Sequence, residues 1–125
     1  MTKEHYKEWL ERLVHIWETK NPNAVLDLVA EKFIWHEAPF EKPITTKEDL
    51  LQEWQTILNH EEINVTYEIY TVEDNVGIAH WRATFTRVPS KEKARLDGIY
   101  KVTLDEEGKC TEFHQWYNST PQERR

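Results

Sequence analysis

The residues of this chain that are best suited to chemistry lie between Phe33 and Ile44, in the segment FIWHEAPFEKPI. A short apolar strand runs into Glu37 and then into a turn that Pro39 and Pro43 constrain. This order delivers one carboxylate to the end of a strand, beside aromatic side chains. Burial raises the pKa of a carboxyl group, and such a group can then act as a general base. The alternative is an ordinary surface carboxylate in a loop.

Two later polar residues are candidate partners of Glu37. Tyr100 lies in an apolar strand, where it either contacts a ligand or is a core residue with a satisfied hydroxyl group. Gln115 alternates with Phe113 and Tyr117, so these three side chains share one face of a strand. An amide between aromatic rings suits hydrogen bonding to a ligand carbonyl, and a buried structural amide is the alternative. The predicted catalytic set is therefore Glu37, Tyr100 and Gln115.

Asp97 is an ambiguous candidate. Simple alternation puts Tyr100 and Gly98 on one face of the strand and Asp97 on the other. A bulge at Gly98 would reverse this and turn Asp97 toward a ligand. The favoured interpretation is a structural ion pair with Arg82 or Arg95 on the outer face of the sheet.

Composition limits the classes of function. The chain has 125 residues, a net charge of −7 and no cluster of Lys or Arg, which argues against binding to nucleic acid. No apolar run approaches 18 residues and the first residues are too polar for a signal peptide, so we expect a cytoplasmic protein that does not enter a membrane. The length predicts a single domain over residues 1–125.

Cofactors and metals are not expected. The six histidines show no HxH or HExxH spacing, and Cys110 is the only cysteine. No dinucleotide fingerprint or Gly-rich phosphate loop is present among only three glycines. The chain does contain six Trp, five Tyr and four Phe, more than a core alone explains, so some of them are expected to line a cavity.

Periodicity divides the chain into helices followed by strands. Thr2 is a candidate N-cap for a helix through Trp17, Asn21-Pro22 begins a second helix with a stripe through Val29, and Thr46 begins a third. The terminal segments MTKE and PQERR are expected to be solvated or frayed tails. The predicted strands are Phe33–His36, Ile63–Ile69, Val76–Val88, Ala94–Leu104 and Cys110–Tyr117.

Helices that precede a meander of strands indicate the α+β class. Long strands twist and curl, which leaves a concave face for the helices to cover. We therefore predict three N-terminal helices packed on a strongly curved, mostly antiparallel sheet, together forming a cone-shaped half barrel. The apolar interior of such a cone is a natural site for a small molecule.

In this order and spacing, several segments resemble the SnoaL-like group of the nuclear-transport-factor-2-like superfamily, from Tyr6 to Tyr117. The resemblance implies one ligand-binding domain of a fold that hosts isomerases, hydrolases, cyclases and binding modules. The segments that carry it are NPNAVLDLVAEKFIW, HEAPFEKPITTKEDLLQEW, AHWRATFTR, LDGIYKVTLDEEGKCTEF and HQWY.

The resemblance to ketosteroid isomerases of this superfamily implies roles for particular residues. Their proton-moving carboxylate matches Glu37, or Ala38 if one gap is placed. Their oxyanion-binding tyrosine falls on Leu13, which has no donor, and their protonated aspartate falls on Tyr100, which has one. Because polar parts are replaced, steroid isomerisation is not expected. The predicted ligand-binding residues are Leu13, Trp17, Trp35, Trp54, Trp81, Asp97, Phe113 and Tyr117.

Two hypotheses from different classes follow. The first is a small-molecule enzyme of isomerase, hydratase or hydrolase type, needing no cofactor, that acts on an apolar or carbonyl-bearing molecule through Glu37. The second is a non-catalytic ligand-binding or dimerisation module. A homodimer is expected in either case, because side chains such as Ile99, Phe113 and Trp116 would otherwise be exposed on the outer face of the sheet.

Overall fold

The computed structural model describes residues 1–120; residues 121–125, which make up the segment PQERR, lie outside the described residues. This part of the chain forms two α-helices, two 3-10 helices and five strands. The first strand lies between the two pairs of helices, and the other four strands follow the second pair. The elements are α1 (Lys3–Glu18), η1 (Pro22–Leu28), β1 (Val29–His36), α2 (Lys47–Trp54), η2 (Gln55–Asn59), β2 (His60–Glu73), β3 (Val76–Arg87), β4 (Lys93–Leu104) and β5 (Cys110–Ser119).

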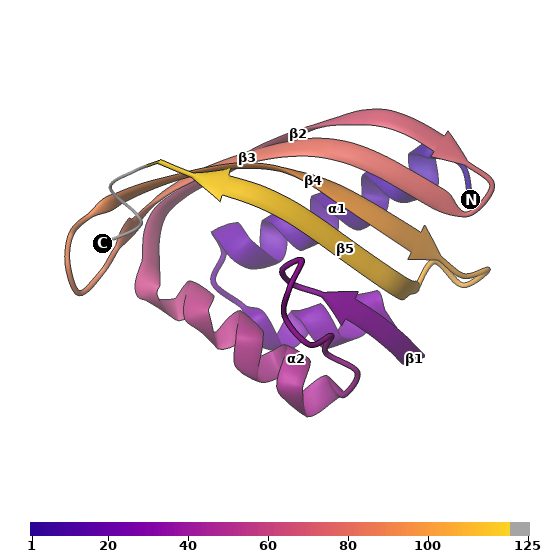
Figure 1. Cartoon of the computed structure of the whole chain (residues 1–125), viewed down its shortest axis with the longest axis horizontal. Coiled ribbons are helices and arrows are strands. Elements are labelled where there is room, and N and C mark those ends of the chain that lie inside the picture. The colour runs from indigo at the N-terminus through magenta and orange to yellow at the C-terminus, as the bar shows by residue number, and fades with distance from the viewer. Residues whose placement is uncertain (121–125) are drawn as a thin grey trace.

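The strands form one mixed sheet in the order β1-β5-β4-β3-β2. Strand β1 runs parallel to β5, and every other neighbouring pair is antiparallel. The long strands β2 to β5 curve as one layer, and the helices lie on one side of it (Figure 1). The predicted α+β class with a mostly antiparallel sheet is confirmed, although the sheet is open, with β1 and β2 at its edges.

Helix α1 begins with a capping box. The backbone N–H of His5 donates to Thr2 Oγ1, and the backbone N–H of Thr2 donates to His5 Nδ1. Thr2, Lys3 and Glu4 are exposed to solvent, as expected of this segment, while the capping box fixes the backbone at the start of the helix. The apolar stripe of the helix is buried against the sheet, and Tyr6 packs so tightly on Gly77 that an added Cβ would lie 2.4 Å from its ring.

The second predicted helix is a 3-10 helix that ends earlier than expected. It spans Pro22–Leu28, and Val29 already belongs to β1, where it pairs with Cys110. Strand β1 therefore starts four residues before the predicted Phe33. The third helix begins as predicted, with Thr46 Oγ1 accepting from the backbone N–H of Asp49.

The register of the sheet settles which side chains face the helices. Pairing between β3 and β4 is continuous from Lys93 to Thr103, so Gly98 carries no bulge. Tyr100 faces inward and Asp97 outward, as alternation predicts. Phe113 also faces inward and stacks on Trp35, with ring centroids 3.7 Å apart. The expectation that Phe113 lies on the outer face is therefore wrong, because β5 alternates with Gln115 on the inner side.

No helix within residues 1–120 has the length and apolar character needed to cross a membrane.

The core contains most of the tryptophans. Trp9, Trp35 and Trp81 are almost completely buried, and Trp9 Nε1 donates to the backbone oxygen of Leu28.

Candidate functional site

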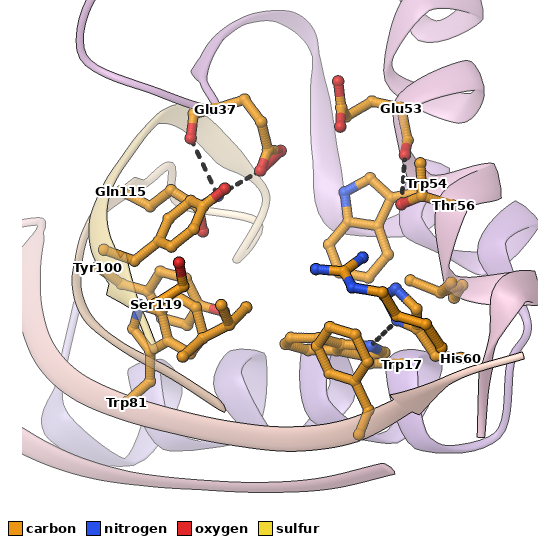
Figure 2. A pocket seen from close by; sticks show the side chains of 15 residues that line it. Trp17, Glu37, Glu53, Trp54, Thr56, His60, Trp81, Tyr100, Gln115 and Ser119 are labelled. Carbon is orange, nitrogen blue, oxygen red and sulfur yellow. Dashed lines mark hydrogen bonds between the residues drawn. The ribbon is translucent and has the colours of Figure 1, made fainter. Parts of the chain in front are cut away.

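A cavity of about 350 Å³ lies between the inner face of the sheet and the segment that contains α2 and η2. Figure 2 shows Glu37, Gln115 and Tyr100 on one side of this cavity, and His60 and Trp17 across from them. We call it the central pocket. Its lining residues are Trp17, Glu37, Glu53, Trp54, Thr56, Ile57, His60, Trp81, Phe85, Arg87, Leu96, Tyr100, Gln115, Tyr117 and Ser119.

Two hydrogen-bond donors from neighbouring strands fix Glu37 at the end of β1. Trp35 Nε1 donates to Glu37 Oε1 over 3.0 Å. Gln115 Nε2 donates to the backbone oxygen of Glu37 over 3.0 Å and also to Glu37 Oε2, the two bonds drawn in Figure 2. Because β1 pairs in parallel with β5, the strand end brings Glu37 beside Gln115. The predicted pair of Glu37 and Gln115 therefore lies together.

Glu37 is the pocket group with the most useful acid–base property. Burial of the carboxyl group raises its pKa from 4.5 to about 7, and the nearby carboxylates Glu53 and Glu41 add to this, while the Trp35 hydrogen bond opposes it. The residue as a whole is only half-buried, but its carboxyl group is surrounded by protein atoms, and the carboxyl environment governs the pKa. Near neutral pH this group can both accept and donate a proton.

Tyr100 supplies a hydroxyl donor to the same end of the pocket. It pairs with Gln115 across β4 and β5, and its ring stacks on Trp81 at a centroid distance of 4.9 Å. Burial, followed by the charge of Glu37, holds the pKa of Tyr100 well above its usual value of 10. The hydroxyl group therefore stays protonated and can donate a hydrogen bond to a ligand oxygen.

The far end of the pocket is formed by the start of β2 and the end of β3. His60 lies beside Arg87 in the β2–β3 register, and its ring stacks on Phe85 with centroids 3.8 Å apart. Trp17 Nε1 donates to His60 Nδ1 over 3.0 Å. Burial, with help from the positive charges of Arg87 and Lys20, lowers the pKa of His60 to about 4, so the ring is neutral at pH 7.

The predicted site residues occupy four different places. Trp17, Trp54, Trp81 and Tyr117 line the central pocket together with the predicted catalytic set. Trp35 and Phe113 stack on each other behind the wall near Glu37, and Leu13 lies on the buried face of α1, enclosed in the core.

Asp97 is not brought to the pocket. It lies on the outer face, where His80 Nε2 is 2.7 Å and Arg82 Nε is 3.0 Å from its carboxylate oxygens. The sequence interpretation that paired Asp97 with Arg82 agrees with this arrangement.

Three ionisable residues of the pocket, Glu53, His60 and Arg87, were missed from the sequence. His60 precedes the predicted start of its strand, and Glu53 precedes Trp54 in the third helix but was not considered as a site residue. Arg87 carried a usable signal, because it continues the inward alternation of Trp81 and Phe85 along β3. No group of three or more His, Cys, Asp or Glu within residues 1–120 is arranged to hold a metal ion.

The sequence profile of the SnoaL-like domain matches residues 10–113. The chain belongs to the SnoaL-like family. The resemblance inferred from the sequence segments is thereby confirmed. A comparison with curated proteins finds none that matches.

Solved structures similar to this SnoaL-like domain share its fold at low sequence identity. SalBIII, described as an epoxide hydrolase/cyclase-like enzyme in pyran ring formation in polyether salinomycin, superposes with a TM-score of 0.80 at 13% identity, covering 94% of this chain and 95% of that one. A candidate isomerase from Bacillus subtilis gives 0.81 at 17% identity, with 94% and 90% covered. A conserved protein from Planctomyces limnophilus gives 0.76 at 10% identity, with 94% and 97% covered. The fold thus includes isomerase-like and cyclase-like proteins.

Proposed function

We propose that this SnoaL-like domain binds a small, mainly apolar, carbonyl-bearing molecule in the central pocket and moves a proton on it without a cofactor. The observation that carries the proposal is the position of the Glu37 carboxyl group. This group faces an aromatic pocket, and burial raises its pKa to about 7. A carboxyl group in a cleft whose pKa is shifted by burial is a candidate functional group. The folds of SalBIII and of the Bacillus subtilis protein agree with such a use.

The chemistry is an enolisation. The ionised Glu37 takes a proton from the carbon next to the ligand carbonyl, the electron pair moves onto the carbonyl oxygen, and the Tyr100 hydroxyl group stabilises the resulting oxyanion by a hydrogen bond. Glu37, now protonated, returns the proton to the same carbon or to another one, so no net charge is gained. Gln115 holds the Glu37 carboxyl group by donating to Oε2 and thereby acts as a positioning residue.

The test is proton exchange on a simple ketone. The wild-type protein is incubated in D2O with 2-tetralone, and loss of the α-proton signal is followed by NMR. We expect exchange above the buffer rate that the Glu37→Gln variant loses. Asp97→Asn is the matched control, because it removes a carboxylate that pairs with Arg82 on the outer face of the sheet, away from the pocket. Equal exchange by wild type and Glu37→Gln contradicts the proposal.

The second candidate function is a binding or dimerisation module without catalysis. Two features favour it. Leu13 matches the position of the oxyanion-binding tyrosine in ketosteroid isomerases, but it has no donor and is enclosed in the core. The outer face of the sheet also exposes apolar groups. Trp116 is 43% exposed and stacks on His114, which in turn stacks on His36. Ile34, 41% exposed, extends this surface.

We propose that this outer face joins two copies of the domain. Burying Trp116 and its neighbours against a second copy would remove apolar surface from water at both subunits. Analytical ultracentrifugation at micromolar concentration is expected to give a dimer that Trp116→Ser shifts toward monomer. A wild-type monomer contradicts the dimer but leaves the pocket proposal intact. The cone shape around the pocket and the cytoplasmic location remain predictions.

A further inference from the structure

We propose that the ligand of the central pocket carries an anionic group, a carboxylate, which Arg87 and His60 bind at the end of the pocket across from Glu37. This inference rests on the proposed function, because it names the substrate class for the same pocket. The class is a cyclic or aromatic oxo-acid: a carbonyl beside Glu37, an apolar body between the aromatic walls and a carboxylate at the far end.

The first support is an arginine in the pocket without an acidic partner. Arg87 lines the pocket, and its guanidinium group lies over the Phe85 ring at 5.4 Å from the centroid. No carboxylate of residues 1–120 makes an ion pair with it, in contrast to Arg82, which pairs with Asp97 on the outer face. A guanidinium held among aromatic rings matches a carboxylate in shape and charge.

The second support is the protonation state of His60. The indole N–H of Trp17 can only donate, so Nδ1 of His60 must be an acceptor without a proton. Because the ring is neutral, its proton is on Nε2. No hydrogen bond from Nε2 to another side chain is present within residues 1–120, and the ring lines the pocket beside Arg87. His60 therefore offers a neutral N–H donor next to a cation, which is the arrangement an anion requires.

The third support is the space between the two ends. The lining also contains the large apolar and aromatic side chains Trp54, Trp81, Leu96 and Tyr117. Arg87, His60 and Tyr117 all line this one cavity. At about 350 Å³ the cavity is near the lower end of the range for ligand pockets, so it suits one small ring system and not a long chain.

The experiment measures binding and not turnover, so it is independent of whether Glu37 is a base. Isothermal titration calorimetry at pH 7 compares 4-acetylbenzoate, which has a ketone and a carboxylate at opposite ends of one ring, with its primary amide, which keeps the ring and the ketone but lacks the charge. We expect the carboxylate to bind at least 10-fold more tightly to wild type. Arg87→Gln is expected to remove that preference, Arg87→Lys to restore part of it, and Arg82→Gln, the matched control on the outer face, to leave it unchanged.

Equal binding of the two probes, binding of neither, or an unchanged preference in Arg87→Gln would overturn the inference. If Glu37→Gln stops ketone exchange but keeps the carboxylate preference, both proposals stand. If wild type shows no exchange and the preference is still present, only the proposed enolisation fails. A separate test is ¹⁵N NMR of the histidine rings: His60 should carry its proton on Nε2 from pH 6 to pH 8, and a proton on Nδ1 would overturn its role as a donor.

Discussion

Two carboxylates on opposite faces of the same sheet have opposite acid–base properties. Glu37, at the end of β1, lies in the central pocket, and burial raises its pKa to about 7. Asp97, in β4, lies on the outer face, where hydrogen bonds and charges from His80 and Arg82 lower its pKa below the usual 3.8. A carboxylate with cationic partners stays ionised and inert, whereas one that is buried beside other carboxylates can exchange a proton at neutral pH.

Two arginines of β3 show the same contrast between the outer face and the pocket. Arg82 is neutralised by Asp97 on the exposed face, so it has a structural partner. Arg87 is five residues further along β3 and has no acid within ion-pair distance among residues 1–120. Arg82 and Asp97 therefore neutralise each other on the outer face, whereas the pocket contains an acid that can exchange a proton near neutral pH and an arginine without an acidic partner among residues 1–120.

The largest expected effect is on the rate of proton exchange, when the pocket carboxylate is removed. Glu37→Gln should reduce α-proton exchange on 2-tetralone by about 100- to 10,000-fold, the range for loss of a general base. Asp97→Asn should leave the rate within about twofold, since Asp97 is separated from the pocket by the sheet. NMR exchange rates in D2O measure both. Similar losses in the two variants would mean that the pocket carboxylate has no special role.

The raised pKa of Glu37 also predicts a pH-dependent difference in stability between wild type and Glu37→Gln. The Glu37 pKa is about 7 in the folded protein against 4.5 when unfolded, so the folded state binds more protons between these values and its stability falls as pH rises. The penalty is absent below pH 4.5, complete above pH 7, and at most about 3 kcal/mol. The neutral Glu37→Gln variant lacks it, so urea unfolding should show wild type losing stability relative to this variant between pH 4.5 and pH 8. A difference that does not change with pH would contradict the raised pKa.

Gly98 tests the packing that separates the two faces. An added Cβ would lie 2.2 Å from the backbone oxygen of Trp116 and 3.0 Å from Trp81 Nε1, so Gly98→Ala should cost about 1–3 kcal/mol and displace the Trp81 wall. Gly108, in the β4–β5 turn at φ +79°, has open space around it, and Gly108→Ala should cost less, about 1 kcal/mol, from backbone strain alone. Thermal unfolding of both variants measures the difference. Equal costs would mean that the sheet relaxes at Gly98.

Much of the fold was predictable because its signals are local. The Thr46 cap, the alternation in β3 and β4 and the inward position of Tyr100 follow from residue type and period alone. The 3-10 helix was predicted as a longer helix because the stripe of Val25 and Leu28 continues into Val29, and periodicity does not show that Val29 pairs with Cys110 instead.

The site was predictable only in part, because it depends on packing between distant segments. Glu37 and Gln115 were identified from a strand end and a shared face, but their contact depends on the parallel pairing of β1 with β5. Leu13 was inferred from a family position, and burial in the core removes it from the pocket. His60 was missed because its role requires the Trp17 indole, which is 43 residues away in sequence.

The smallest expected effect concerns Asp97 itself. Its lowered pKa means that the ion pair stabilises the folded protein above pH 3.8 and that this contribution is lost as pH falls through the folded-state value. The Asp97 side chain is 57% exposed and its Arg82 partner 68%, so water screens the interaction, and exposed pairs contribute about 0–1 kcal/mol. Asp97→Asn should therefore lower the unfolding free energy by less than about 1 kcal/mol at pH 7, measured by urea unfolding. A loss well above that would show that the outer face is shielded from water, as a dimer interface over His80 and Trp116 would make it, and repeating the measurement in Trp116→Ser would separate the two causes.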